Sequence, residues 1–242
     1  MAARAEVVLP APDGSRELPA IPEASDVRLT PEEWSKVRAG DWVVQVVRRG
    51  EEDLQARAIG YVRSSPVAMF DVAVDSEIAA TFDEIESAVI LESWPHGKRF
   101  DMVVEPHFLL PSYEFTSVSA FHDLHVAQTF GQIRGDFQRN EGTHSYLWDP
   151  ERQETLAVVT FAFALKGVLS ILPEKWILGL ASRDLPKAIR RLDSIALGLA
   201  AEDPPRFRRV QASWQQLRPA LEAGEHPGFL WSGPAAQTAA RQ

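Results

Sequence analysis

Apolar side chains alternate most regularly in residues 155–165, the segment TLAVVTFAFAL. In an extended chain every second side chain points to the same side, so this segment predicts a strand with one strongly hydrophobic face. Residues 174–200 carry apolar side chains at helical spacing and predict a long amphipathic helix. The apolar positions of the strand are Ala157, Val159, Phe161, Phe163 and Leu165. Those of the helix are Trp176, Ile177, Leu180, Ile189, Leu192, Ile195 and Leu199.

Prolines divide the helical pattern in the C-terminal part of the chain. Pro186 lies inside the long helical pattern, where proline removes a backbone hydrogen bond and clashes with the preceding turn. It predicts a kink or short break near Asp184 and Leu185, with two helical segments at an angle. After Asp203 and two prolines, apolar side chains again share one helical face, which predicts a further helix over residues 207–221.

The N-terminal part also changes character along its length. Four prolines within residues 1–27 block helix and internal strand, which predicts an extended or disordered arm. The sequence TPEE at residues 30–33 is typical of a helix start. Threonine caps the helix, proline fits its first turn, and glutamate completes a capping box. Gly40 is expected to end this helix.

The segment between these helices predicts a series of strands separated by Pro, Gly and Asp. Helices interrupt the series only early, where Ser65 and Pro66 begin a short helix over residues 66–75 and a second one follows over 76–82. Strands that follow one another without intervening helices pair antiparallel, so the predicted class is α+β. The predicted strands cover residues 41–48, 55–63, 84–93, 98–104, 113–121, 126–134, 142–148 and 155–165.

The composition excludes several classes of function. The 242 residues carry a formal net charge of −9, which argues against nucleic-acid binding because phosphates need a basic surface. The chain contains no cysteine, and therefore no disulfide, thiolate nucleophile or cysteine zinc site. No apolar run approaches the ~18 residues of a membrane span, and the N-terminus lacks the apolar core of a secretory signal. We expect a soluble monomer, cytoplasmic by default and periplasmic if a leader has been removed.

Histidines offer a weak case for a metal site. His122 and His125 have the spacing of one helix face, and His144 lies elsewhere in the chain. Asp123 and its neighbours predict a surface turn between strands, which favours solvated side chains instead. No HExxH, GxSxG or phosphate-binding loop occurs. We therefore expect no metal, no cofactor and no catalytic residue assigned by a motif.

The order of these segments resembles the START-like superfamily, also called SRPBCC or helix-grip. Four stretches carry the resemblance over about two thirds of the chain: LTPEEWSKVRAGDWVV, ARAIGYVRSSPVAMFDVAVD, RNEGTHSYLWD and LPEKWILGLASRDLPKAIRRLD. The matching landmarks are a helix over residues 66–75 that begins with Pro and ends in Asp, a turn at residues 140–142, and the Leu-Pro pair at 185–186 of the closing helix.

The resemblance implies a curved antiparallel sheet wrapped around a long C-terminal helix, with a hydrophobic cavity between them. It divides the chain into an arm (1–27), a START-like domain (28–202) and a C-terminal helical appendage with its tail (203–242). The implied ligands are sterols, phospholipids, quinones or aromatic polyketides. Alternation along a sheet of this shape then assigns these ligand-binding side chains: Met102, Val104, Tyr113, Phe115, Phe130, Arg134, Phe161, Phe163, Leu165, Trp176, Leu180, Ile189 and Leu192.

Two arrangements of the interior stay open. The rings and aliphatic side chains either leave a cavity or fill a solid core at normal packing density. Gln128, Gln132 and Arg134 share one side of a strand with Phe130. They either point inward, where a buried Arg134 needs an acidic partner, or lie in solvent at the rim of the sheet.

Three functions follow from these patterns. The first is binding and transfer of a hydrophobic molecule, above all a lipid such as a sterol, hopanoid or phospholipid. Met69 and Phe70 would then meet ligand or membrane in transient contact, or else pack inside the fold. The second is an enzyme resembling polyketide cyclases or aromatases, and the third is an interaction module that docks a partner through residues 207–221. The candidate acids and bases of such an enzyme are Tyr113, Arg134, His144 and Tyr146.

Overall fold

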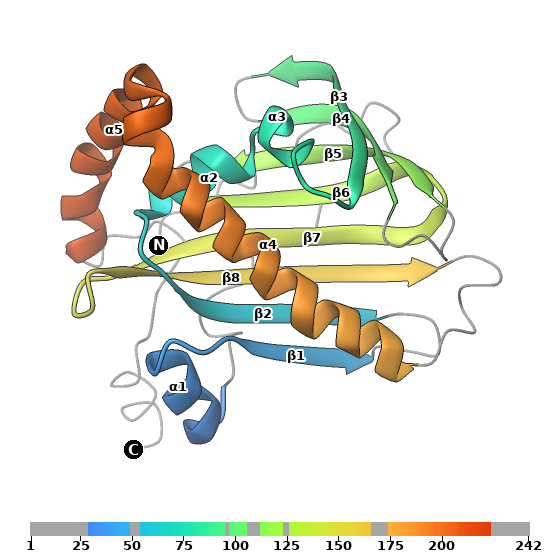
Figure 1. Ribbon diagram of the computed structural model, residues 1–242, viewed down its shortest axis with the longest axis horizontal. Helices are drawn as coiled ribbons and strands as arrows, with labels where there is room; N and C mark the ends of the chain where they lie inside the picture. The colour runs from blue at the N-terminus through green and yellow to red at the C-terminus, as the bar shows by residue number, and fades with distance from the viewer. Residues whose placement is uncertain are drawn as a thin grey trace, which may run out of the picture.

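The computed structural model describes residues 29–48, 54–94, 97–105, 112–122, 126–165 and 174–223. Within them, eight strands form one antiparallel sheet in the order β1-β2-β8-β7-β6-β5-β4-β3 (Figure 1). Pairing of β2 with β8 joins the first hairpin to the end of the strand series, so β1 and β3 are the two edges. The strands are β1 (Val43–Arg48), β2 (Leu54–Val62), β3 (Ile85–Trp94), β4 (Gly97–Val104), β5 (Tyr113–His122), β6 (Ala127–Gly135), β7 (Phe137–Asp149) and β8 (Glu154–Leu165).

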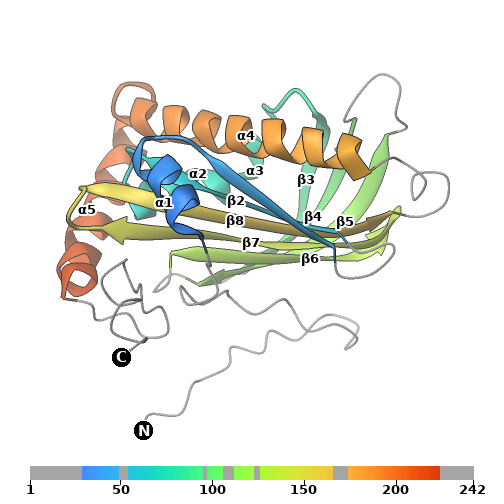
Figure 2. The same ribbon diagram turned by 90° about the horizontal axis from the view of Figure 1, so that it is seen from below.

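Helices cover the sheet and close one of its ends. The longest helix, α4, crosses one face of the sheet diagonally, and α2 and α5 lie near the C-terminal end of α4 (Figures 1 and 2). The helices are α1 (Pro31–Arg38), α2 (Pro66–Ala73), α3 (Ser76–Ala79), α4 (Glu174–Glu202) and α5 (Pro204–Glu222). The α+β class and the antiparallel sheet with a long covering helix are thus confirmed.

Strand register separates the side chains into two faces. Val159 and its register partner Ala58 belong to a cluster that includes Leu192 of α4, and we call this face the helix-facing side. The next residues, Val158 and its partner Ile59, pack with Trp34 and Val37 of α1 on the opposite side. The alternation predicted for residues 155–165 is therefore confirmed as far as its side chains are described, with Ala157, Val159 and Phe161 on the helix-facing side.

The start of α1 follows its capping pattern. Thr30 Oγ1 accepts a hydrogen bond from Glu33 N at 3.2 Å, and Thr30 N donates to Glu33 Oε2 at 2.7 Å. These reciprocal bonds satisfy two backbone donors that the helix itself leaves without partners. The predicted helix start is confirmed, and its buried side chains Trp34 and Val37 pack on the opposite side of the sheet.

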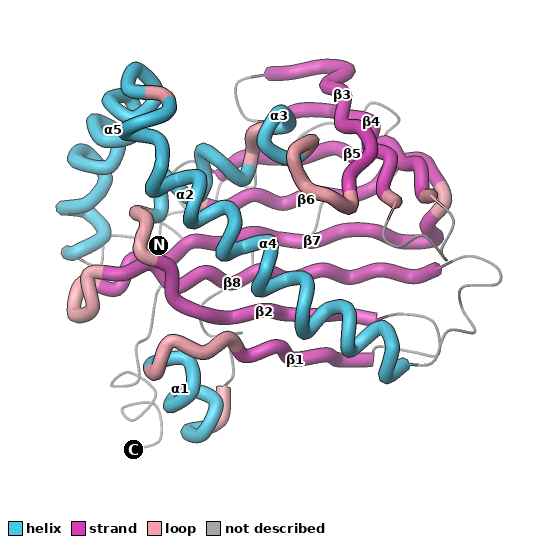
Figure 3. The backbone as a smooth tube through the Cα atoms, in the orientation of Figure 1, coloured by secondary structure: helices cyan, strands magenta, loops and turns pink. Residues whose placement is uncertain are grey.

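The predicted break at Pro186 is wrong. Helix α4 continues through Pro186 as one helix of 29 residues, and the tube in Figure 3 shows no interruption. Proline costs one hydrogen bond with the preceding turn. Burial of Ile189, Leu192 and Leu199 at 3 to 8% exposure further along the helix offsets that cost, because these side chains reach the sheet only if the helix continues.

The predicted turn at residues 140–142 is also wrong, because these residues lie inside β7. The chain turns earlier, at Gly135, whose φ of +139° is one that other residues rarely adopt. Gly142 serves close packing instead, since a Cβ there would lie 2.6 Å from Cζ of Phe130. A glycine in a strand can thus mark close approach rather than a turn.

The predicted division into arm, START-like domain and appendage can be compared with the structure only in part. The arm at residues 1–27 lies outside the described residues. Within the appendage, α5 begins at Pro204, three residues before the predicted start, and Val210, Trp214 and Leu221 of this helix are buried. Val210 belongs to the same cluster as α4 and β8, so α5 packs on the domain.

Candidate functional site

An aromatic cluster occupies the middle of the helix-facing side. The ring centroids of Phe130 on β6 and Phe161 on β8 are 5.2 Å apart. His144 on β7 lies between these strands, with its ring centroid 5.8 Å from that of Phe130 and 5.7 Å from that of Phe161. The register explains the arrangement, because Gly142 pairs with both phenylalanines and leaves room above its own backbone for their rings.

A second aromatic cluster lies closer to the β3 edge. The ring of Phe137 lies 5.0 Å from that of Tyr113 and 5.6 Å from that of Phe115. Met102 pairs with Phe115, and Val104 with Tyr113, so these two aliphatic side chains share the same side of the sheet. The two clusters together place aromatic and aliphatic side chains of five strands, β4 to β8, on the helix-facing side.

Polar side chains interrupt this surface along β5, β6 and β7. Gln128 pairs in register with His144, and its Nε2 donates to Ser119 Oγ on β5 at 2.9 Å. Gln132 Nε2 donates to the carbonyl oxygen of Phe137 at 2.8 Å. Both glutamines are buried, at 5% and 4% exposure, so the inward arrangement is the observed one for these two residues.

Several buried polar atoms in this row have no hydrogen-bond partner among the described residues. They are Oε1 of Gln128, Oη of Tyr146 and both ring nitrogens of His144, although His144 as a whole residue keeps some accessible surface. Buried polar groups in proteins are almost always paired, with protein or with water. Each of these atoms is therefore a place where a bound molecule or an ordered water gains a hydrogen bond.

Burial controls the charge of this row. It lowers the pKa of His144 to about 4 and raises the pKa of the Tyr146 hydroxyl, because the interior disfavours the charged form of each group. Near pH 7 both side chains are neutral. Lys98 on β4 is the charged side chain nearest to them by register on this side, and burial lowers its pKa to about 8.

Burial divides the helix-facing side into two parts. In the closed part, next to α2 and α5, side chains such as Ala58, Met69, Val72 and Ala157 have 0% exposure. In the accessible part, further along the strands from α2 and α5, Phe161, His144, Met102 and Val104 each keep some exposed surface. Tyr146, at 1% exposure, lies in the closed part, two residues from His144 along β7. The two parts therefore meet along the row of polar side chains.

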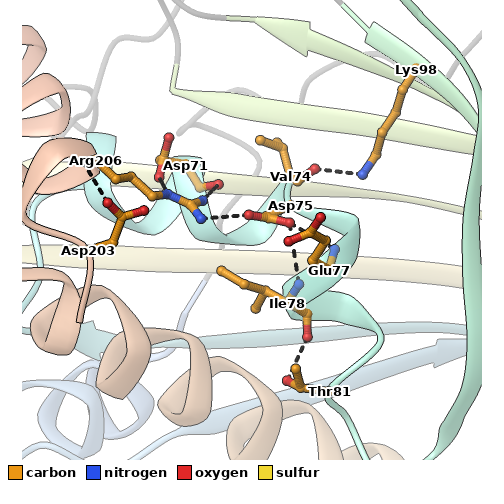
Figure 4. Close-up of polar contacts among 9 residues, drawn as sticks. All are labelled: Asp71, Val74, Asp75, Glu77, Ile78, Thr81, Lys98, Asp203 and Arg206. Carbon is orange, nitrogen blue, oxygen red and sulfur yellow. Dashed lines mark hydrogen bonds and ion pairs between the residues drawn. The ribbon is translucent and has the colours of Figure 1, made fainter.

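Charged contacts hold α2 over the closed part (Figure 4). Arg206 of α5 donates from Nε to Asp71 Oδ2 at 2.5 Å and from Nη1 to Asp75 Oδ2 at 2.6 Å. On the other side, Lys98 Nζ donates to the carbonyl oxygen of Val74 at 2.6 Å, at the C-terminal end of α2. A cation is favourable there because of the helix dipole.

Aromatic contacts fix α5 at the same end. The rings of Trp148 on β7 and Trp214 on α5 meet edge to face, with centroids 4.8 Å apart. The guanidinium of Arg218 lies 5.6 Å from the Trp148 ring and 6.0 Å from the Trp214 ring. The appendage is thus part of the wall that closes this end of the interior.

The structure brings most of the predicted ligand-binding residues to the helix-facing side. Met102, Val104, Tyr113, Phe115, Phe130 and Phe161 lie on this side of the sheet, and Ile189 and Leu192 are buried on α4. The inward position predicted for Arg134 is wrong. A register shift in β5–β6 pairs Arg134 with Thr116, on the opposite side, where it is exposed. The side chains of Phe163, Leu165, Trp176 and Leu180 lie outside the described part of the structure.

Met69 and Lys98 bear on the site although neither is among the predicted ligand-binding residues. Met69 is fully buried in the closed part, so it packs inside the fold rather than meeting a membrane. Lys98 also belongs to the site, and the sequence patterns did not predict it there. Its spacing of two from Phe100 and Met102 is the signal that could have placed it on this side.

The described residues contain neither a group of metal ligands nor a membrane-spanning helix. They contain no group of three or more His, Cys, Asp or Glu side chains placed to hold a metal ion. None of the helices in these ranges has the length and apolarity needed to cross a bilayer.

Known proteins match this chain in structure but not in sequence. No family model matches the chain, and no curated protein is significantly similar to it. The crystal structure of TTHA0849 from Thermus thermophilus superposes with a TM-score of 0.54 at 22% identity, over 61% of this chain and 99% of that protein. Together with the sheet order and the covering helix, this match shows the START-like helix-grip fold that the sequence resemblance predicted.

Two other solved structures are similar in outline. A START superfamily protein from Mycobacterium smegmatis gives a TM-score of 0.49 at 19% identity, over 60% of this chain and 98% of its own. The Zhui aromatase/cyclase from Streptomyces sp. R1128 gives 0.44 at 14% identity, over 70% of this chain and 96% of its own.

Proposed function

We propose that this chain binds a hydrophobic small molecule between α4 and the helix-facing side of the sheet. One observation carries the proposal. Phe161 and His144 lie in the middle of the sheet, on the face that the longest helix covers, yet both keep accessible surface. On the opposite side of the same strands, Val158 and Ser145 have 1% and 0% exposure. Apolar surface left accessible at the centre of a fold is typical of a ligand site.

Apolar burial supplies the binding energy in this proposal. A ligand that buries about 300 Å² of apolar surface gains roughly 7 kcal/mol at ~25 cal/mol per Å², before the cost of immobilisation is subtracted. Aromatic rings from two clusters provide flat contact surface for that purpose. The preferred ligand is a lipid such as a sterol, hopanoid or phospholipid.

Transfer of such a ligand requires contact with a membrane. Three consecutive aliphatic side chains on edge strand β3, Val89, Ile90 and Leu91, are 46 to 54% exposed. They offer apolar surface for a transient contact by a monomer.

An enzyme that acts on a hydrophobic polyketide is the second candidate. His144 and Tyr146 favour it, because they lie on the same side of β7 and are available as acid and base in the interior. Arg134, exposed on the opposite side, has no part in it. Replacement of His144 or Tyr146 should then abolish turnover of an aromatic polyketide substrate, whereas binding alone should survive.

Native mass spectrometry tests the binding proposal directly. Protein stripped of bound molecules by organic extraction and refolding is offered a panel of sterols, hopanoids, phospholipids and aromatic polyketides. We expect saturable uptake of one molecule per chain for at least one class. A folded protein that takes up none of them would overturn the proposal.

A further inference from the structure

Three side chains with unpaired polar atoms are neighbours by register on the helix-facing side of β6 and β7. Gln128 and His144 are register partners on β6 and β7, and Tyr146 is the next residue of β7 on the same side. Each has a buried side-chain atom without a hydrogen-bond partner among the described residues. The surrounding side chains are apolar: Phe130 and Phe161 beside His144, and Met69, Val126 and Ala157 in the cluster around Tyr146.

The hydrogen-bonding capacity of this group is mixed. A neutral imidazole offers one donor and one acceptor, and a phenol hydroxyl offers both. Gln128 uses its amide nitrogen on Ser119, which leaves its oxygen as an acceptor. A hydroxyl group of a ligand both donates and accepts, and a carbonyl accepts, so both match what these three side chains present.

Charge is absent from this group. Burial holds His144 and Tyr146 in their neutral forms near pH 7. On the helix-facing side of β4–β8, as far as these strands are described, Lys98 is the one charged side chain, and its amine is already bonded to Val74 O. A carboxylate or phosphate moved here from water would lose its hydration, and the one cation on this side, Lys98, is already engaged with Val74 O, so the transfer is costly.

We infer that the ligand carries a neutral hydroxyl or carbonyl oxygen, that His144, Tyr146 and Gln128 bind this oxygen, and that charged groups are excluded from the same position. This inference rests on the proposed function, and it narrows the ligand class. Sterols, other polycyclic alcohols and aromatic ketones satisfy it with their polar end inside. A phospholipid or a free fatty acid would have to keep its charged group outside this row.

Three probes of equal chain length separate the outcomes: tetradecan-1-ol, tetradecanoate and tetradecane. Each is titrated at pH 7.5 against a fluorescent hydrophobic dye bound to the stripped, full-length protein. We expect the alcohol to bind roughly tenfold more tightly than the alkane, the size of one net hydrogen bond, and the carboxylate more weakly than the alcohol. Equal binding of alcohol and alkane, or tightest binding of the carboxylate, would overturn the inference.

Failure of the proposed function gives a different result. If the dye, all three probes and a panel of polycyclic compounds fail to bind, the interior takes up no ligand, and the inference falls with the proposal. If the probes bind but the alcohol does not bind more tightly than the alkane and the carboxylate, binding of hydrophobic molecules is supported and only the inference is overturned.

Three variants test which side chains bind the oxygen of the ligand. Tyr146→Phe removes one hydroxyl and keeps the ring, so it should weaken the alcohol several-fold and leave the alkane unchanged. His144→Phe should do the same, and the ring nitrogens of His144 in the parent protein should shift in ¹⁵N NMR spectra when the alcohol binds. Ser145→Ala is the matched control, because it removes a hydroxyl from the same strand on the opposite side. Loss of alcohol preference in Ser145→Ala, or its persistence in both other variants, would contradict the assignment.

Discussion

The closed and accessible parts of the helix-facing side differ although they belong to one sheet under one helix. In the closed part, α2 fills the space over β7 with Met69 and Val72, both at 0% exposure. In the accessible part, Phe161 and Met102 keep accessible surface although α4 crosses the same face of the sheet. The difference suggests that stability resides mainly at one end of the interior and ligand contact at the other.

Sequence composition explains the division. The closed part uses small and aliphatic side chains, Ala58, Val72 and Ala157, which interdigitate with helices. The accessible part uses larger side chains, the rings of Phe130 and Phe161, of which Phe161 keeps accessible surface while Phe130 is 8% exposed. The polar row of Gln128, His144 and Tyr146 marks the boundary between the parts.

Truncation of a methionine in each part gives the largest expected contrast. Met69→Ala leaves a cavity in the closed part and should lower the free energy of unfolding by about 2–5 kcal/mol. Met102→Ala, in the accessible part, should cost under about 1 kcal/mol, because less surface is buried there. Urea denaturation of both variants measures the difference. Equal losses would mean that the two parts are packed alike.

Lowering the pH should destabilise the folded protein through His144. Its pKa in the folded protein, about 4, lies below the ordinary value of 6.5, so the unfolded chain binds a proton first as pH falls. The contribution of His144 is complete above pH 6.5 and is lost toward pH 4, by up to about 3 kcal/mol. His144→Phe should flatten the dependence of unfolding free energy on pH between 6.5 and 4. An unchanged slope in this variant would show that the ring nitrogens of His144 are not shielded from water.

Substitution of Gly142 tests how closely the Phe130 ring packs on the sheet. A Cβ there would overlap the backbone carbonyl oxygen of Thr160 and would lie 2.6 Å from Phe130 Cζ, so Gly142→Ala should displace both strand β8 and the ring and cost about 1–3 kcal/mol. Gly198→Ala in α4 is the control, since its Cβ would meet only the flexible end of Glu202 and alanine favours helix. Thermal unfolding compares the two variants. A Gly142→Ala protein as stable as the parent would exclude close packing of this ring.

The contact between α5 and α2 has the smallest expected effect. Arg206→Ala removes bonds to Asp71 and Asp75 at a partly exposed site, and should cost about 1–2 kcal/mol. Arg209→Ala, exposed on the same helix, should stay within about 0.5 kcal/mol of the parent. Hydrogen exchange should quicken in α5 and α2 of the Arg206 variant alone. Unchanged exchange there would show that the tryptophan contact is sufficient.

Local patterns predicted the elements well. Alternation in residues 155–165 gave both the strand and the face that meets α4, and Thr30 with Glu33 gave the start of α1. These features depend on neighbours close in sequence. Each was therefore predictable without knowledge of the fold.

Features that depend on distant contacts were not predictable. Arg134 lies outside the interior because the register between β5 and β6 shifts by one residue. Alternation along β6 alone does not reveal this shift. Gly142 looked like a turn residue because its distant partner, the Phe130 ring, was unknown. Pro186 was expected to break α4, and only the packing of the whole helix on the sheet keeps it continuous.

NMR spectra of the protein with a bound hydrophobic ligand test the central claim most directly. Intermolecular nuclear Overhauser effects should connect the ligand to the methyl group of Met102 and the ring of Phe161, and not to the methyl groups of Val158 or Ile59. Contacts of the ligand with Val158 and Ile59 in place of Met102 and Phe161 would contradict binding between α4 and the sheet.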